Sequence, residues 1–214
     1  MNMELWQQRL SAALQSTANH DIDDELRDER YFGTPERGYV DAAVLIPITR
    51  RPEPGLLLTQ RPETMRSHPG QVAFPGGKVD PEDQDAIATA LREANEELAI
   101  PAEAVEVIGT GECYHSASGF SITPVVAFLP ADLPLMANPA EVADWFEMPF
   151  TDAVDHQAIK RRYGHWKGHR RGYYELIWQK RRIWGVTAGI LANLARQIAA
   201  VDDHAMVRDS GVNG

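Results

Sequence analysis

The sequence predicts an α/β (α+β) sandwich built around a mixed β-sheet, and three observations carry that prediction. Apolar runs of strand length recur along the chain, the first of them at residues 42–48. Turn residues separate these runs from one another. Two segments, residues 86–98 and 187–201, have apolar residues at helical spacing. Strands interleaved with helices in this way are typical of a sheet covered by helices.

Each strand is predicted from its own apolar run. Residues 56–60 follow a Pro-Glu-Pro-Gly turn and are expected to form a hairpin with residues 42–48. The remaining runs predict single strands and a second hairpin near the C-terminus. The single strands are expected at residues 72–74, 105–111 and 123–130, and the hairpin at 173–178 with 181–186. Residues 142–150 are expected to form a strand or a short turn that leads into the next element.

The length of 214 residues fits one domain with short extensions. Residues 1–34 are expected to form an N-terminal helical and acidic arm. Residues 35–202 are expected to form the main domain, and residues 203–214 a flexible tail.

Composition excludes several classes of protein. No apolar run approaches the roughly 18 residues of a membrane span, and the N-terminus has no secretory signal pattern. The single cysteine, Cys113, excludes an internal disulfide framework and a multi-cysteine zinc site, so a cytoplasmic location is expected. A net charge of −10, from 21 basic and 31 acidic residues, disfavours a general nucleic-acid-binding surface.

The helix expected at residues 86–98 is acidic on one side. At about 100° per residue, an apolar stripe forms the expected buried face. This stripe consists of Ile87, Leu91, Ala94 and Leu98. Glu93, Glu96 and Glu97 are expected on the opposite side, at spacings i, i+3 and i+4 that make them surface neighbours.

Three neighbouring carboxylates repel one another, and a divalent cation would offset the repulsion. Mg²⁺ prefers oxygen ligands and usually takes few of them from the protein. Glycines just upstream, at residues 76 and 77, allow close backbone approach to an ion or a phosphate. The alternative is that the three glutamates form an ordinary solvated helix face.

The order of these residues closely resembles the signature of the Nudix hydrolases, which is Gly, five residues, Glu, seven residues, then Arg-Glu-U-x-Glu-Glu-x-Gly-U with U bulky and apolar. The matching positions are Gly77, Asp83, Arg92, Glu93, Glu96, Glu97 and Ile100. The chain departs from the pattern in four ways. Asp83 replaces Glu, eight residues separate it from Arg92, Ala99 replaces the late glycine, and Ala94 is smaller than the usual bulky residue.

The resemblance implies a Nudix-type α/β/α sandwich with a mixed β-sheet, and an enzyme that hydrolyses a nucleoside diphosphate linked to another group. It implies Mg²⁺ or Mn²⁺ ions that neutralise the diphosphate and activate a water. The implied metal ligands are Glu93, Glu96 and Glu97, with the Gly77 carbonyl. Arg92 would orient Glu93, which is the first candidate to accept the proton of the water.

Glu141 is a downstream carboxylate that offers a second candidate for the proton acceptor. It lies in the segment Asn-Pro-Ala-Glu-Val-Ala-Asp-Trp-Phe at residues 138–146. Its alternative role is a polar cap before the next element.

Residues 57–77 resemble a second motif, which belongs to the coenzyme A pyrophosphatase branch of the family. The motif is Leu-Leu-Thr-x-Arg-Ser-x-x-x-Arg-x-x-x-Gly-x-x-x-Phe-Pro-Gly-Gly, and only Pro62 departs from it. The resemblance implies hydrolysis of coenzyme A or its derivatives to 3′,5′-ADP and 4′-phosphopantetheine. Arg61, Arg66 and Gly76 are the expected substrate-binding residues, although both arginines have ion pairing with surface acids as an alternative.

Two alternative functions stay open. One is a Nudix hydrolase of another nucleoside diphosphate, such as ADP-ribose. The other is a non-catalytic nucleotide-binding or RNA-binding module. The expected partner is a small-molecule substrate rather than a nucleic acid or a membrane, and a homodimer is left open.

A basic segment at residues 160–182 holds nine of the 21 lysines and arginines, with aromatic residues such as Tyr163, Trp166, Tyr173 and Tyr174 among them. Three uses are considered, in order of preference. They are pairing with the acidic N-terminal arm, a contribution to binding substrate phosphates, and binding of RNA.

Overall fold

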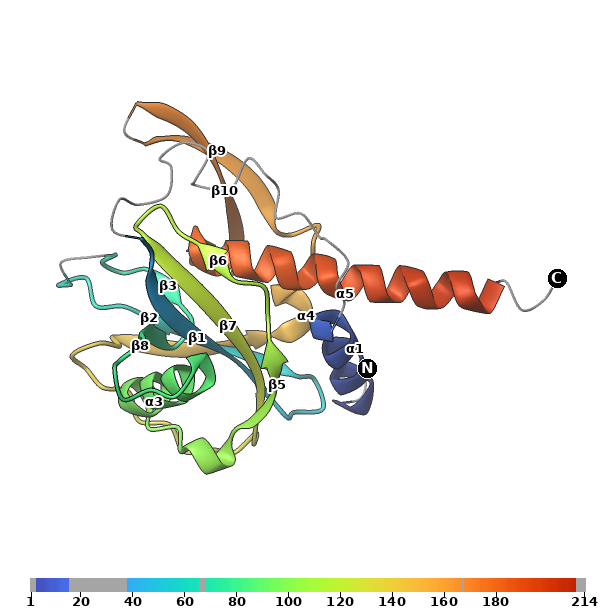
Figure 1. Cartoon of the computed structure of the whole chain (residues 1–214), viewed down its shortest axis with the longest axis horizontal. Helices are drawn as coiled ribbons and strands as arrows, with labels where there is room; N and C mark the ends of the chain where they lie inside the picture. The colour runs from blue at the N-terminus through green and yellow to red at the C-terminus, as the bar shows by residue number, and fades with distance from the viewer. Residues whose placement is uncertain (1–2, 16–37, 66–67, 167, 211–214) are drawn as a thin grey trace.

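The computed structural model describes residues 3–15, 38–65, 68–166 and 168–210 (Figure 1). The helices are α1 (Met3–Gln15), α3 (Ala86–Leu98), η2 (Ala102–Ala104), α4 (Phe150–Ala153) and α5 (Val186–Ser210). The strands of the main sheet are β1 (Val40–Thr49), β2 (Gly55–Gln60), β3 (Val72–Ala73), β4 (Gly76–Lys78), β5 (Glu106–Thr110), β6 (Tyr114–His115), β7 (Phe120–Leu129) and β8 (Asp144–Pro149). A second, three-stranded sheet contains β9 (Lys160–Trp166), β10 (His169–Trp178) and β11 (Arg181–Trp184).

The main sheet is mixed, as the sequence predicts. Its central strands β1 and β7 run parallel, from the pair Val40–Phe120 to the pair Thr49–Leu129. The other strand pairs in this sheet are antiparallel, including the predicted hairpin of β1 and β2. The order is β3-β2-β1-β7-β5, with β4 paired to β1, β6 to β7 and β8 to β2.

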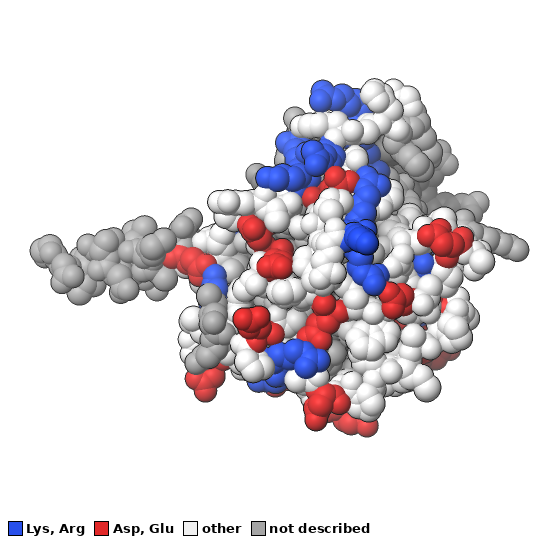
Figure 2. Space-filling model, turned by 180° about the vertical axis from the view of Figure 1, so that it is seen from behind, with Lys and Arg blue, Asp and Glu red and all other residues white. Residues whose placement is uncertain are grey.

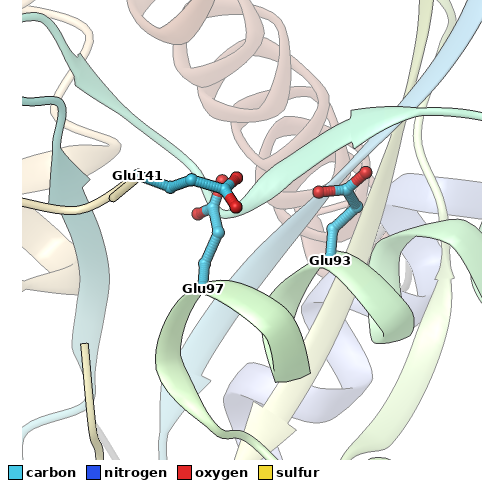
Figure 3. Close-up of side chains that lie close together, drawn as sticks. All are labelled: Glu93, Glu97 and Glu141. Atoms are coloured by element: carbon cyan, nitrogen blue, oxygen red, sulfur yellow. The ribbon is translucent and has the colours of Figure 1, made fainter. Parts of the chain in front are cut away.

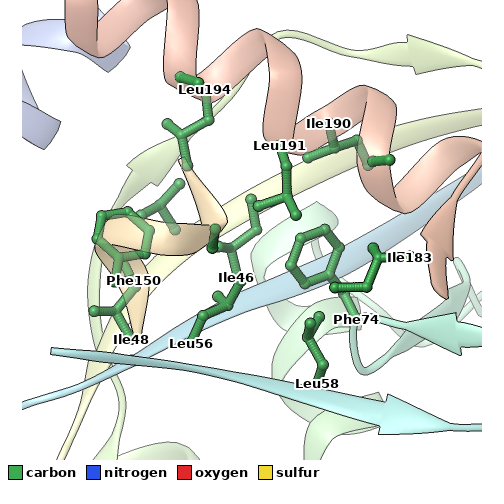
Figure 4. Close-up of a cluster of buried hydrophobic side chains, with 14 of the residues drawn as sticks. Ile46, Ile48, Leu56, Leu58, Phe74, Phe150, Ile183, Ile190, Leu191 and Leu194 are labelled. Carbon is green, nitrogen blue, oxygen red and sulfur yellow. The ribbon is translucent and has the colours of Figure 1, made fainter. Parts of the chain in front are cut away.

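Both faces of the central strands are buried, which explains their continuous apolar runs. Leu45 on β1 points to the side of α3, together with Val125 on β7. Ile46 points to the other side, where α1, α4, α5 and the second sheet pack (Figure 4). Each of these side chains is at most 1% exposed. Each such burial contributes about 1.5–3 kcal/mol, so the alternation fixes which strand residues face α3.

The structure departs from the predicted boundaries at both ends of the chain. Helix α1 belongs to the core, because Trp6, Leu10 and Ala13 are buried and the Trp6 ring meets Phe150 edge-on at 4.9 Å. The side chain of Arg9 pairs with Asp202 of α5, which lies beside α1 (Figure 1). The rest of the predicted arm, residues 16–34, lies outside the described residues.

Helix α5 extends the predicted helix of residues 187–201 in both directions, from Val186 to Ser210. It therefore enters the range expected to be a tail, of which residues 211–214 lie outside the described part. Within the described residues, no helix is long and apolar enough to cross a membrane.

The second sheet contains the predicted C-terminal hairpin, which is formed by β10 and β11. The basic segment before it forms a further strand, β9, which pairs with β10. Strand β9 was not predicted, because its alternation of basic and aromatic residues lacks an apolar face. The inner side of this sheet contributes Leu176 and Ile183 to the core.

Candidate active site

Strand β4 precedes α3 along the chain and pairs with β1, and it contains two glycines. A side chain at Gly76 would place its Cβ 2.4 Å from the carbonyl oxygen of Ala43. A side chain at Gly77 would place its Cβ 2.2 Å from a carboxylate oxygen of Glu93. Neither distance is tolerated by a real Cβ: a side chain at Gly76 would collide with the backbone of β1, and one at Gly77 would displace the Glu93 carboxylate. Gly77 thus makes room for the Glu93 carboxylate beside β4.

Helix α3 spans the predicted residues 86–98, and both of its ends are capped. Asp85 is the N-cap, and its carboxylate accepts a hydrogen bond from the Ala88 N–H at 2.8 Å. Ala99 ends the helix in the left-handed conformation, with φ of 56°. The family pattern has glycine there, and an alanine in that conformation costs about 1–2 kcal/mol.

Asp83 and Arg92 form a densely bonded pair at the start of the helix. The Asp83 carboxylate accepts hydrogen bonds from the Arg92 Nη2 at 3.0 Å, the Thr89 hydroxyl at 2.9 Å and the Asp80 N–H at 2.9 Å. The bond from Arg92, followed by the bond from Asp80, holds the pKa of Asp83 well below its usual range. The same bond raises the pKa of Arg92. This pair therefore stays ionised at all physiological pH values.

Arg92 also binds both neighbouring glutamates. Its Nη1 donates to Glu93 Oε1 at 3.0 Å and to Glu96 Oε2 at 3.2 Å, and its Nη2 donates to the Lys78 carbonyl at 3.0 Å. The bond to Glu93 supports the orienting role predicted for Arg92. Glu96 is half exposed, at 50% of its side-chain surface.

Glu97 is buried, and this corrects the expectation that it lies on the polar side of α3. Only 4% of its surface is exposed. The buried face contains Ala90, Ala94 and Leu98, whereas Ile87 and Leu91 are only partly buried. Small residues at positions 90 and 94 let the helix lie close to the sheet, and its buried arc is rotated from the predicted stripe toward Glu97.

Glu141 reaches the site from the loop between β7 and β8. The loop is attached to the C-terminal end of α3, because the Asn138 N–H donates to the Glu97 carbonyl at 2.9 Å and the Met136 N–H to the Leu98 carbonyl at 3.0 Å. These bonds satisfy two carbonyls that a helix end leaves unpaired. The Asn138 side chain contacts Glu141 Oε1 at 3.3 Å. Asn138 was not among the predicted site residues, although Asn followed by Pro is a recognisable turn signal.

Glu93, Glu97 and Glu141 form a carboxylate cluster (Figure 3). One oxygen from each lies within 4.8 Å of the other two. Glu96 does not belong to this group, so the cluster differs from the predicted ligand set by having Glu141 in its place. The predictions that Glu96 and the Gly77 carbonyl bind metal stay predictions.

The cluster is electrostatically unfavourable by itself. Burial raises the pKa of Glu97 to about 8, and repulsion from Glu93 and then Glu141 adds to the effect. The charge of Arg61 and a hydrogen bond from the Gly76 N–H act in the opposite direction. Burial also raises the pKa of Glu93, although Arg92 opposes the rise. Glu97 Oε2 is buried and has no hydrogen-bond partner among the described residues.

These features fit a hard divalent cation. Mg²⁺ and Mn²⁺ prefer carboxylate oxygens, and a cation between the three carboxylates would give the orphaned Glu97 oxygen a partner and offset the repulsion. Gly77 leaves space for the Glu93 carboxylate, which is consistent with Glu93 binding such a cation.

Of the two predicted substrate-binding arginines, the structure describes Arg61, which directly follows β2. Its N–H donates to the Gln71 carbonyl at 3.0 Å, and its side-chain Nε is buried without a hydrogen-bond partner among the described residues. Its positive charge acts to lower the pKa of Glu97 in the carboxylate cluster. Arg66 lies outside the described residues. Gly76 is the third predicted substrate-binding residue; its backbone acts to lower the pKa of Glu97, and its role in binding substrate stays a prediction.

The basic segment forms much of the second sheet, and Figure 2 shows Lys and Arg side chains gathered at that end of the molecule. Arg162 and Arg182 share the Glu175 carboxylate, at 3.0 and 2.6 Å. Arg181 pairs with Asp144 of β8 at 2.6 Å. These ion pairs are intramolecular, but their acids belong to the folded domain rather than to the N-terminal arm.

The family model described as the NUDIX domain matches residues 39–171, more than half of the chain. The chain belongs to the Nudix family. A protein of Cronobacter sakazakii, described as an uncharacterized Nudix hydrolase NudL, is 53% identical over 161 residues, covering 73% of this chain and 82% of that protein. A Yersinia pestis protein with the same description is 46% identical over 177 residues, covering 83% and 87%. The chain is therefore a Nudix hydrolase by family, which confirms the predicted enzyme class.

Two solved structures are similar to this chain at low sequence identity. An Ap4A hydrolase of C. elegans in a binary complex is 24% identical with a TM-score of 0.46, covering 54% of this chain and 83% of that one. The NUDIX domain of Shewanella oneidensis NrtR, complexed with ADP ribose, is 21% identical with a TM-score of 0.43, covering 59% and 84%. Scores and identities this low say nothing about the substrate of this chain.

Proposed function

We propose that this Nudix hydrolase cleaves the diphosphate of coenzyme A or its derivatives, giving 3′,5′-ADP and 4′-phosphopantetheine, and that it acts in the cytoplasm. The observation that carries the proposal is that the charge of Arg61 acts on Glu97 of the carboxylate cluster. Arg61 belongs to the motif of residues 57–77 that resembles the coenzyme A pyrophosphatase branch. The motif and the cluster thus meet at one site.

Glu93, Glu97 and Glu141 are the residues that would hold a divalent cation, with Glu96 as the alternative given by the family signature. When bound, Mg²⁺ or Mn²⁺ supplies positive charge against the diphosphate and lowers the pKa of a coordinated water.

The chain itself supplies orientation, proton transfer and phosphate binding. Hydrolysis adds water across a P–O–P linkage, so a nearby base must take a proton. Arg92 fixes Glu93 Oε1, which orients the Glu93 carboxylate to act as that base. Glu141 is the second candidate, because it lies in the same cluster on a separate loop. The half-buried side chain of Arg61 is available to bind a phosphate oxygen, which would satisfy its buried, unpaired Nε.

The test is product analysis by mass after incubation with coenzyme A, ADP-ribose or a dinucleoside polyphosphate, each with Mg²⁺. We expect 3′,5′-ADP and 4′-phosphopantetheine from coenzyme A, at a higher kcat/KM than for the other two substrates. Faster cleavage of ADP-ribose would reject the proposed substrate but keep the hydrolase. Glu97→Gln serves as the inactive variant, and Glu103→Gln, on the exposed η2, serves as the matched control.

A further inference from the structure

Trp145 stands apart from the other tryptophans whose side chains the structure describes. Trp6 packs on Phe150 and beneath Arg9, Trp178 stacks on Phe146, and Trp184 meets Tyr173 and Arg182. The Trp145 ring has no aromatic, cationic or hydrogen-bonding partner among the described residues, and 38% of its surface is exposed. It lies on β8, which pairs only with β2 among the described strands.

The strand register places Trp145 on the same face of the sheet as the carboxylate cluster. Trp145 lies opposite Thr59 of β2, and Glu147 lies opposite Leu57. Leu57 packs in the core beneath α3, so the side chains of this set point to the α3 side. The even-numbered β8 residues Phe146 and Met148 point to the other side.

Trp145 is also close to the site along the strands. Arg61 follows Thr59 by two residues, and its N–H bond to the Gln71 carbonyl extends the pairing between β2 and β3. The Arg61 side chain therefore lies on the same face of the sheet as the Thr59 side chain. Diagonal neighbours of this kind lie about 7–8 Å apart, within reach of an aromatic and a long side chain. Glu141 precedes Trp145 by four residues, which separates them by at most about 13 Å.

We propose that Trp145 is the residue that stacks on the purine base of the nucleotide half of the substrate. This inference rests on the proposed hydrolysis of a nucleoside diphosphate. An indole presents a flat π-face on which a base stacks, and a partner-free, exposed ring offers that face without first breaking another contact. The neighbouring Arg61 then lies near the point where the phosphates are attached to the nucleoside. Trp145 thereby selects substrates that carry a base over diphosphates that do not.

The test measures binding without turnover. The dissociation constants of 3′,5′-ADP and of its base-free analogue, D-ribose 3,5-bisphosphate, are measured by calorimetry for four proteins. These are the unmodified chain, Trp145→Ala, Trp145→Phe and the matched control Trp184→Ala, whose ring is 36% exposed on the second sheet. Thermal unfolding of each variant shows that it is folded.

We expect Trp145→Ala to weaken binding of 3′,5′-ADP by at least ~10-fold. Trp145→Phe should recover most of the affinity, and the base-free analogue should bind all four proteins equally. Equal affinity of Trp145→Ala and Trp184→Ala for 3′,5′-ADP would overturn the inference. The inference would also be overturned if Trp145→Ala changed the oligomeric state in solution and left nucleotide binding unchanged. The ring would then contact a second copy of the chain.

The binding test separates this inference from the proposed substrate. If the enzyme does not cleave coenzyme A but binding of 3′,5′-ADP depends on Trp145, then the base-stacking role stands and the coenzyme A assignment falls. If coenzyme A is cleaved and Trp145→Ala binds 3′,5′-ADP normally, then the base-stacking role falls alone.

Discussion

Two groups of charged side chains lie next to each other at helix α3, and they differ in how well their charges are balanced. Around Arg92, the charge of the guanidinium is matched by Asp83, Glu93 and Glu96 and by a backbone carbonyl. Around Glu97, three carboxylates gather, and one buried oxygen has no partner among the described residues. The two groups share Glu93, which accepts from Arg92 and faces the cluster.

The difference separates structure from function. A satisfied network keeps its geometry without a ligand, because each buried polar atom already has a partner. A buried cluster of like charges costs stability unless something else binds it. We therefore read the Arg92 group as the support that holds Glu93 in place, and the Glu97 group as the binding site.

The largest expected effect is a loss of activity without a loss of stability when Glu97 is changed. Glu97→Gln should lower kcat at least ~100-fold, equivalent to about 2.7 kcal/mol, because it removes a charge needed to hold the cation. Stability without metal at pH 8 should be unchanged or higher, because the neutral amide removes a buried charge while keeping an acceptor for the Gly76 N–H. Steady-state kinetics and thermal unfolding of the same preparations measure both.

An unchanged kcat at saturating Mg²⁺ would remove Glu97 from the ligand set. A large fall in Tm would instead show that the carboxylate has a structural role and that the contrast with Arg92 is wrong. Glu103→Gln should leave both quantities unchanged, because Glu103 is exposed on η2.

The opposite pattern is expected at Arg92, where a substitution should lower both the stability of the fold and the activity. Arg92→Ala should lower kcat about 10-fold, because Glu93 loses its orienting partner. It should also lower the Tm by several degrees at pH 7. The pKa of Asp83 is depressed in the folded state, so its stabilising effect is present above the ordinary value near 3.8 and is lost as the pH falls further.

The stability difference between Arg92→Ala and the unmodified chain should therefore persist down to about pH 4 and shrink below it. Unfolding curves over this pH range measure it. A difference in Tm that is the same at pH 2 and pH 7 would show that Arg92 stabilises the fold by packing rather than by its bond to Asp83.

The sequence predicted those features that depend on local periodicity and spacing. The apolar run at residues 42–48 predicted β1, and the helical spacing of apolar residues predicted α3 at residues 86–98. Two features depended on tertiary contacts instead. The burial of Glu97 follows from how closely α3 packs on the sheet, and the place of Glu141 follows from the attachment of its loop to α3.

The helix at the N-terminus shows the same limit. Its apolar residues suggested one helix face but not its partner, and the partner is α5, nearly the whole chain length away. Sequence spacing contains no information on such a contact, so residues 3–15 were taken for an arm rather than part of the core.

A smaller effect links metal binding to pH. The pKa of Glu97 is raised from about 4.5 to about 8 in the folded chain without metal, so the folded state holds a proton that the unfolded state has lost between these values. Stability without metal should therefore fall as the pH rises from about 4.5 to 8. Mg²⁺ should restore it by binding the folded state, with about 2.7 kcal/mol at a concentration of 100 times its Kd.

The rise in Tm on adding Mg²⁺ should consequently be larger at pH 8 than at pH 5, where the ion must displace a proton from Glu97. Differential scanning calorimetry at both pH values measures the two shifts. A variant with Glu93, Glu97 and Glu141 all changed to glutamine should lose the shift and its pH dependence. If that variant keeps the full shift, the ion binds elsewhere.

The smallest effect is expected at Glu96, and it decides between two ligand sets. The family signature includes Glu96, whereas the structure pairs it with Arg92 at the surface and places Glu141 in the cluster. An exposed pair of this kind contributes only about 0.3–0.5 kcal/mol, so Glu96→Gln should leave the Tm almost unchanged. If Glu141 is the third ligand, then kcat at saturating Mg²⁺ should change less than ~3-fold for Glu96→Gln and at least ~10-fold for Glu141→Gln. The reverse order in the two kcat values would show that Glu96 leaves Arg92 when the cation binds. The Arg92 group would then be part of the binding site rather than its support.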